Sequence, residues 1–233
     1  MLRRPKAETL MKTTSRAVAA VTVLLLLTPL TARGQTPPAN TGAAANLVAG
    51  VDQKWQVSTD NGLTWFSAFQ VQNPPGVWQA GTASYSWISA TPSGTGSNAL
   101  NGNYLFRTSF DLTGFDAASA SMTFLCAVDN LPGGSGGFYS LNGGAYGGTC
   151  GEQSSFKFTG TQTVNSGFNS GSNELVFHVF GDNTTDGLVV GNMALEATAS
   201  SVPEPASIAL LATGLVGVFG AARRRRDARK TVT

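Results

Sequence analysis

Two short stretches of the chain have residue spacings that acyl-transfer chemistry uses. Gly133–Gly137 reads G-x-S-x-G, but a nucleophile elbow needs a strand before it and a helix after it. The glycine-rich surroundings favour a chance match. Ser154 and Lys157 read S-x-x-K, which brings the two side chains together only on a helix. Phe156 and Phe158 alternate around Lys157 as in a strand, and a strand puts Ser154 and Lys157 on opposite faces.

The sequence also offers no clear candidate for a general base. His178 is the only histidine, and its neighbours alternate as in a strand, so a sheet-face role is favoured over a catalytic one. A structural zinc site would need more His and Cys residues than this chain has. We therefore predict no catalytic residue and no enzyme activity, with a hydrolase of unrecognised type as the alternative.

One loop has part of the spacing of a calcium site. Asp182 and Asp186 occupy the first and fifth positions of an EF-hand-like loop, but Met193 stands at the twelfth, where a bidentate Glu is needed. This is not an EF-hand, and a polar turn explains the pattern. Calcium can still bind in the loop of a β-protein through carboxylates. We predict no cofactor otherwise, and the calcium candidates are Asp60, Asp182 and Asp186, with Asp52 and Asp129 as further contributors.

Aromatic residues carry the hypothesis of ligand binding. The four tryptophans all lie in the first half of the chain. Sugar rings stack on exposed aromatic side chains, and Asp and Asn side chains supply hydrogen bonds to hydroxyls. The alternative for every Trp is a place in the core. The candidate ligand-binding residues are Trp55, Trp65, Asp129, Asn130 and Asn142.

The chain has two cysteines, Cys126 and Cys150. Two cysteines in one exported domain most often pair, because the compartment is oxidising. Closing this loop would stabilise the fold by about 3–4 kcal/mol on the chain-entropy model. The sequence therefore predicts a disulfide, with a buried thiol and an exposed thiol as the alternative.

Period-two alternation dominates the middle of the chain. Asn103–Asp111 places Tyr104 and Phe106 on one side, and 121–128 and 173–180 alternate in the same way. Asn61-Gly62 between apolar stretches predicts a hairpin. We predict an all-β fold over residues 49–199, a single antiparallel jelly-roll-like β-sandwich.

Five segments of the chain resemble the galactose-binding-domain-like sandwich. They are Tyr104–Leu112, Ala127–Asn130, Leu141–Gly143, Asn173–Phe177 and Gly187–Val190. The resemblance implies a β-sandwich module that often binds carbohydrate, although many members have no known ligand. It does not carry over ligand residues position by position.

The N-terminus predicts a secretory signal peptide over residues 1–34. Lys12 and Arg16 supply positive charge, an apolar stretch follows over 17–27, and small residues precede a cleavage site after Gly34. Met11 is an alternative start, and an uncleaved anchor is the alternative to cleavage. Residues 35–48 are rich in Pro, Ala, Thr and Asn and predict a flexible leader.

The C-terminal segment 200–233 combines three features in a fixed order. A Pro-Glu-Pro stretch cannot continue a helix or a strand ladder. The apolar run 206–222 follows, and its seventeen residues would span roughly 25 Å as a transmembrane helix. Basic residues then keep the end in the cytoplasm. The motif residues are Val202, Pro203, Glu204 and Pro205, and the membrane-stop residues are Arg223, Arg224, Arg225 and Arg226.

This order resembles the PEP-CTERM sorting signal of bacterial exported proteins. The resemblance implies a membrane-embedded exosortase that recognises the tail and removes it. It also implies passage through the secretion translocase and signal peptidase. The expected location is the cell envelope or the extracellular space, after transient anchoring in the inner membrane. A simple tail anchor is the alternative.

The positive net charge of the chain belongs to its ends. The whole chain is formally +2, yet residues 35–203 contain three Lys or Arg and ten Asp or Glu, a charge of −7. Such a domain repels phosphate backbones, so nucleic acid is not an expected partner. We predict a non-catalytic surface or matrix-associated protein. A carbohydrate-binding module for exopolysaccharide or another glycan is the alternative, consistent with the association of exosortase systems with biofilm.

Overall fold

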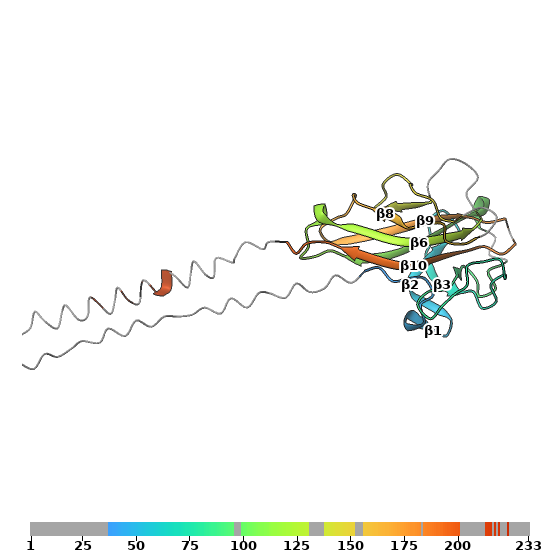
Figure 1. Cartoon of the computed structure of the whole chain (residues 1–233), viewed down its shortest axis with the longest axis horizontal. Helices are drawn as coiled ribbons and strands as arrows, with labels where there is room; N and C mark the ends of the chain where they lie inside the picture. The colour runs from blue at the N-terminus through green and yellow to red at the C-terminus, as the bar shows by residue number, and fades with distance from the viewer. Residues whose placement is uncertain are drawn as a thin grey trace, which may run out of the picture. The chain divides into compact units, whose positions relative to one another are not determined.

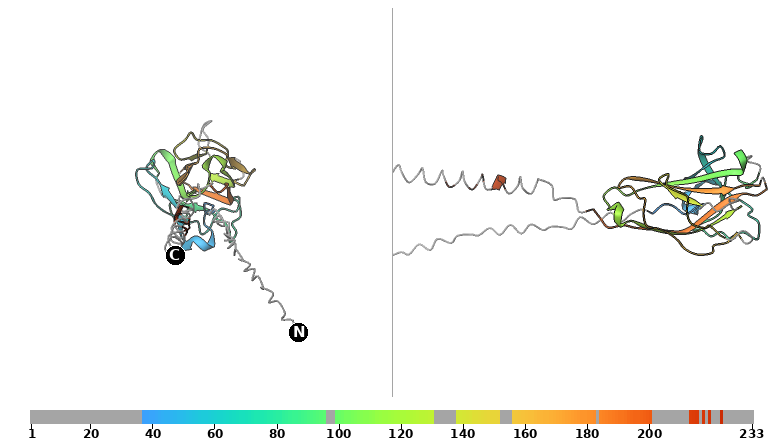
Figure 2. Two further views of the ribbon diagram at one scale, coloured as in Figure 1. Left: turned by 90° about the vertical axis from the view of Figure 1, so that its left-hand side faces the viewer. Right: turned by 90° about the horizontal axis from the view of Figure 1, so that it is seen from above.

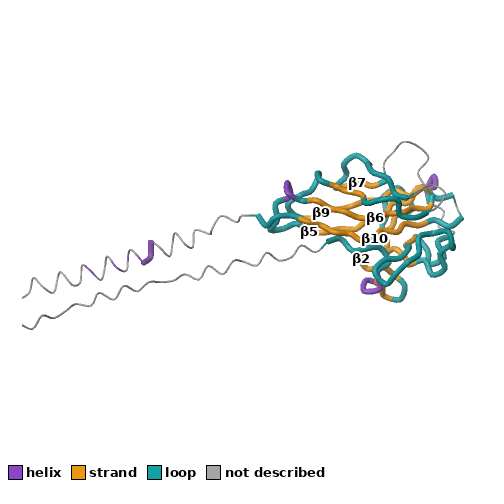
Figure 3. Tube along the Cα trace, in the orientation of Figure 1, coloured by secondary structure: helices purple, strands orange, loops and turns teal. Residues whose placement is uncertain are grey.

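The computed structural model describes residues 37–95, 99–130, 138–151, 156–182 and 184–200, and isolated positions of a helix at 213–215, 217, 219 and 223. The domain in this described part is built from strands and loops, with only short helical turns (Figure 3). In chain order the elements are η1 (Ala44–Asn46), β1 (Leu47–Val48), β2 (Val51–Ser58), β3 (Phe66–Gln70), β4 (Ile88–Ser89), η2 (Leu100–Gly102), β5 (Asn103–Asp111), η3 (Ala117–Ser119), β6 (Ser121–Asp129), β7 (Tyr139–Leu141), β8 (Gln162–Val164), β9 (Ser172–Phe180) and β10 (Gly187–Glu196).

All strand pairs are antiparallel, and the order is β7-β9-β5-β2-β3-β4-β10-β6-β8, with β1 on β2. Hydrogen bonding continues from strand to strand through the short strands β3 and β4. The two layers of the predicted sandwich are therefore the two halves of one curled sheet (Figures 1 and 2). The all-β class is confirmed, whereas the jelly-roll order of strands stays a prediction.

The core lies between the β5–β9 half and the β6–β10 half of the sheet. Alternation predicts the inward faces of β5, β6 and β9 correctly, because every second residue there is buried. Phe124 of β6 meets Phe177 of β9 across the core, with ring centroids 5.5 Å apart. These rings belong to the larger of two clusters of buried apolar side chains, whose burial stabilises the domain.

A second apolar cluster covers the outer side of β6 and β10. Trp78 and Trp87 lie 4.0 Å apart, ring to ring, and pack on Ala127 and Val189. The predicted strand around Lys157 is wrong. Phe156 has a left-handed backbone (φ 47°), and it and Phe158 pack on this cluster from a loop, because the cluster is large enough to bury them without a strand ladder.

The predicted disulfide is confirmed. Cys126 of β6 is bonded to Cys150, with a Cα–Cα distance of 4.8 Å. Both residues are buried. The bridge ties the loop after β7 to β6.

The described part of the expected flexible leader packs on the domain. Thr41 is fully buried, accepts a hydrogen bond from Val190 N at 2.9 Å and donates to Ser86 O at 2.8 Å. Asn40 Oδ1 accepts from Met193 N at 2.9 Å. The expectation of a flexible leader is therefore wrong for residues 37–48, because their polar side chains satisfy backbone groups of β10 and its neighbours.

The signal peptide and the apolar run predicted at the two ends fall outside the described residues, apart from the few helical positions after 212. Within the described part of the chain, no helix is both long enough and apolar enough to cross a membrane.

Candidate functional site

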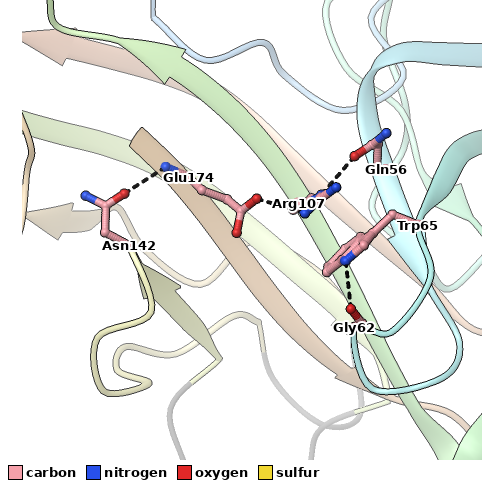
Figure 4. Close-up of polar contacts among 6 residues, drawn as sticks. All are labelled: Gln56, Gly62, Trp65, Arg107, Asn142 and Glu174. Atoms are coloured by element: carbon pink, nitrogen blue, oxygen red, sulfur yellow. Dashed lines mark hydrogen bonds and ion pairs between the residues drawn. The ribbon is translucent and has the colours of Figure 1, made fainter. Parts of the chain in front are cut away.

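A row of polar and aromatic side chains crosses the outer face of β2, β5 and β9 (Figure 4). Arg107 of β5 stands at its centre. Its Nε donates to Gln56 Oε1 at 2.8 Å, and its Nη1 donates to Glu174 Oε2 at 3.1 Å. Strand register explains the first contact, because Gln56 and Arg107 are direct cross-strand partners. We call Gln56, Trp65, Arg107 and Glu174 the outer-face row.

Trp65 adds an aromatic surface to this row. The Arg107 guanidinium lies 4.1 Å from the centroid of the indole ring, a cation–π contact. The Trp65 Nε1 donates to Gly62 O at 3.0 Å, so the turn after β2 holds the ring (Figure 4). Asp60 braces the same turn by accepting hydrogen bonds from Ser58 Oγ and Thr64 N. Trp65 is half-buried, which leaves part of the ring in contact with solvent.

Asn142 connects to the row through the backbone of Glu174. Its Oδ1 accepts from Glu174 N at 2.9 Å, and its Nδ2 donates to Gly167 O at 2.7 Å and Asn173 Oδ1 at 2.9 Å. These contacts engage the amide group on both sides. Asn142 therefore fixes the turn after β7 in place and positions Glu174.

The row offers a fixed set of binding groups. Gln56, Arg107 and Glu174 together present an amide, a guanidinium and a carboxylate, and Trp65 presents a ring. Arg107 and Glu174 keep side-chain exposures of 28% and 41%. Hydroxyl-rich ligands need donors and acceptors of this kind beside an apolar ring. The arrangement of the four side chains therefore suits the binding of a hydroxyl-rich ligand.

The other three tryptophans are buried. Trp55 is fully buried in the main core, 5.7 Å from the ring of Phe177, and its Nε1 donates to Ala39 O at 2.8 Å. Trp78 and Trp87 belong to the second cluster. Trp55 is therefore wrong as a ligand-stacking candidate, because burial leaves no ring face for a ligand.

Asp129 and Asn130 lie at the end of β6. Asp129 is 7% exposed, and its Oδ2 accepts a hydrogen bond from Trp78 Nε1 at 2.6 Å. Asn130 exchanges backbone hydrogen bonds with Phe180. Burial raises the pKa of Asp129 to about 6, the Trp78 hydrogen bond lowers it, and the charges of Asp186 and Asp182 raise it further. The structure gives Asp129 a structural partner in place of a ligand.

The three calcium candidates serve local structure. Hydrogen bonds from Thr64 and Ser58 lower the pKa of Asp60 to about 2. Asp182 accepts from Thr184 within its own turn. Asp186 is 1% exposed and accepts from Asp182 N at 3.1 Å, and burial raises its pKa to about 6. Over the described ranges, no cluster of three His, Cys, Asp or Glu residues could hold a metal ion.

His178 lies on the outer face of β9, as its alternation predicts. Its Nε2 pairs with Asn103 Oδ1 at 2.8 Å, and its ring lies 5.8 Å from that of Tyr146. Burial lowers the pKa of His178, which favours the neutral imidazole. The glycine-rich stretch 133–137 and Ser154 fall outside the described residues.

Sequence reasoning did not find Gln56, Arg107 and Glu174. The available signal was the alternation of β5, which places Arg107 on the face opposite Tyr104 and Phe106. A single arginine in the middle of a strand of an acidic domain needs a partner on the same outer face. Cross-strand register supplies that partner, and register is not readable from one sequence.

Comparison with known proteins gives information on the tail. No curated protein matches the chain. Residues 201–226 match the PEP-CTERM protein-sorting motif. The matched residues cover the whole predicted order of Pro-Glu-Pro stretch, apolar run and arginine cluster. The chain thus ends in a PEP-CTERM sorting motif, which supports export, sorting by exosortase and a location in the cell envelope or outside the cell.

Proposed function

We propose that the chain is a non-catalytic protein of the cell surface or extracellular matrix, delivered there by exosortase sorting. The observation that carries this proposal is the sorting motif at 201–226 directly behind a folded β-domain. The disulfide between Cys126 and Cys150 suits an oxidising compartment outside the cytoplasm. The tail is the sorting signal, and the acidic β-domain is the part that is exported.

The proposed route begins with the signal peptide over residues 1–34, which directs the chain to the translocase and is cut after Gly34. The apolar run 206–222 then holds the folded domain at the inner membrane. Exosortase cuts near Pro203–Pro205 and passes the domain to the envelope or the extracellular space. The arginine cluster stays in the cytoplasm throughout.

The non-catalytic part of the proposal follows from how the one histidine of the sequence is engaged. His178 Nε2 pairs with Asn103 Oδ1 at 2.8 Å, and burial lowers the pKa of the imidazole. We therefore propose a structural role for this side chain.

The sorting proposal is tested by replacing Pro203, Glu204 and Pro205 together with alanine in the native host. The expected result is an unprocessed precursor that accumulates in the membrane fraction. Ser207→Ala, inside the apolar run, is the matched control and is processed normally. Normal processing of the triple variant would contradict the proposal.

Glycan binding by the outer-face row is a second proposal for the same molecule. It rests on the half-buried Trp65 ring beside the bonded side chains of Gln56, Arg107 and Glu174. Such a surface can stack a sugar ring and bond its hydroxyls without further rearrangement. The ligand class would be exopolysaccharide of the producing cell.

Affinity electrophoresis in gels that contain the host's exopolysaccharide tests this second proposal. Trp65→Ala should abolish the retardation of the native domain, and Trp65→Phe should keep part of it. Phe66→Ala is the matched control, because Phe66 is an exposed aromatic residue paired with Val57 and faces away from Gln56. Equal retardation of Trp65→Ala and the native domain would rule out the row as the binding site.

A further inference from the structure

The chain leaves the β-domain through a short clamp that holds Ala197–Ser200 against the loop 113–119. Asp116 N donates to Thr198 O at 2.8 Å, and Ser200 N donates to Gly114 O at 2.9 Å. Between these bonds, Phe115 and Ala199 form an antiparallel bridge. The segment 197–200 before the tail is therefore an added edge of the fold.

Side chains reinforce this clamp. Ser119 Oγ lies 2.8 Å from both Thr198 N and Thr198 Oγ1. Asp116 Oδ1 accepts from Ala118 N at 3.0 Å and so caps η3, which presents Ser119. The loop and the departing chain are thus bonded through three successive residues, 198 to 200. We call residues 113–119 and 198–200 the exit face.

Sequence distance then limits how far the exit face can lie from the membrane. The apolar run begins at Ala206, six residues after Ser200. Six residues reach at most about 20 Å even when fully extended. Val202 is two residues after Ser200, which allows about 7 Å. An enzyme that holds the motif next to the membrane must therefore meet the exit face while the clamp is closed.

We propose that the exit face is the docking surface of the β-domain for the membrane-embedded sorting protease. This inference rests on the proposed sorting function. The clamp fixes the backbone up to Ser200, and the protease binds the motif that follows in sequence and the exit face together. The cavity lined by Ser119, Ser121 and Leu195 beside the clamp lies within this contact.

The test is a pulse-chase measurement of tail removal in the native host. Ala118→Arg places a long charged side chain on the exposed centre of the exit face, and processing should slow about tenfold, a loss of 1.4 kcal/mol in docking. A flexible Gly-Ser spacer of about twelve residues after Ser200 should slow the native chain by a similar factor, because the motif and the exit face can then no longer be bound together, and it should add little to the defect of Ala118→Arg.

Ala80→Arg is the matched control. Ala80 is also exposed and follows Trp78, which contacts Asp129 at the other end of β6 from Ser121. This control should be processed at the native rate. A thermal unfolding midpoint of the Ala118→Arg domain equal to that of the native domain shows that this variant folds.

The outcomes separate the inference from the function on which it rests. Native-rate processing of Ala118→Arg, or of the native chain with the spacer, overturns the docking surface and leaves sorting intact. A native chain whose tail is never removed overturns both. A photo-crosslinking side chain at position 118 should form an adduct with the protease. An adduct with lipid alone would also overturn the proposal.

Discussion

Asp129 and Asp186 show how strongly single side chains depend on their surroundings in this domain. Asp129 is held by Trp78 Nε1, and Asp186 lies at the start of β10, beside the residue that pairs with Asp129. Burial raises the pKa of each carboxyl to about 6. Because the unfolded pKa is near 3.8, both carboxyls keep their protons to a higher pH in the folded domain than in the unfolded chain.

This arrangement predicts a pH dependence of stability. A raised folded pKa contributes stability that is complete below the unfolded pKa and is lost as pH rises through the folded pKa. The free energy of unfolding should therefore fall between about pH 4 and about pH 7. Asp129→Asn should flatten this fall, since a two-unit shift corresponds to about 3 kcal/mol. Chemical denaturation across this pH range measures the effect.

Asp111→Asn is the control for that measurement. Hydrogen bonds from Thr113 lower the pKa of Asp111, an exposed carboxyl. Its contribution is present above the unfolded pKa and is lost only as pH falls below about 4. Its substitution should leave the range from about pH 4 to about pH 7 unchanged. An Asp129→Asn profile as steep as the native one would contradict the account of Asp129.

The role of a single residue was predictable from the sequence where its chemistry alone decides its partner. Cys126 and Cys150 pair because export fixes the redox state. Trp55 and Trp65 have the same chemistry, yet one is fully buried and the other half-buried. Their burial differs because Trp55 lies within β2 and Trp65 lies in the turn after it. Local sequence does not reveal this difference.

At the scale of elements, the loop after β7 depends on one glycine. Gly148 has φ +69°, and a Cβ there would collide with the Tyr139 ring. Gly148→Ala should destabilise the domain by about 2 kcal/mol, through overpacking and backbone strain. The adjacent Gly147 has open space around it, so Gly147→Ala should have little effect. Thermal unfolding of both variants decides the matter, and equal melting temperatures would contradict it.

The long strands were predictable, and the short ones were not. β5 and β9 show period-two burial over nine residues each, which reflects one buried face. β6 alternates as far as Cys126, after which the second cluster also covers its outer face. β4 has two residues and owes its existence to its partners β3 and β10. Residues 37–48 look like a leader because their polar side chains bond to distant backbone, as Thr41 does with Val190. Such long-range bonds leave no local pattern.

On the scale of the whole molecule, charge and targeting divide the chain. The basic residues gather in the ends, and the domain between them carries −7. The sorting motif at 201–226 was predictable because its three features are continuous in sequence. The outer-face row was not, because strand pairing assembles it from β2, β5 and β9. The sorting motif is therefore clearer from the sequence than the outer-face row.

Intact-mass analysis of the protein from its native host tests the sorting account most directly. We predict a chain that begins at Gln35, ends near Pro203–Pro205 without the arginines at 223–226, and lacks the two thiol hydrogens of Cys126 and Cys150. A mature protein that still carries Arg223 to Arg226 would contradict removal of the tail and leave a simple membrane anchor.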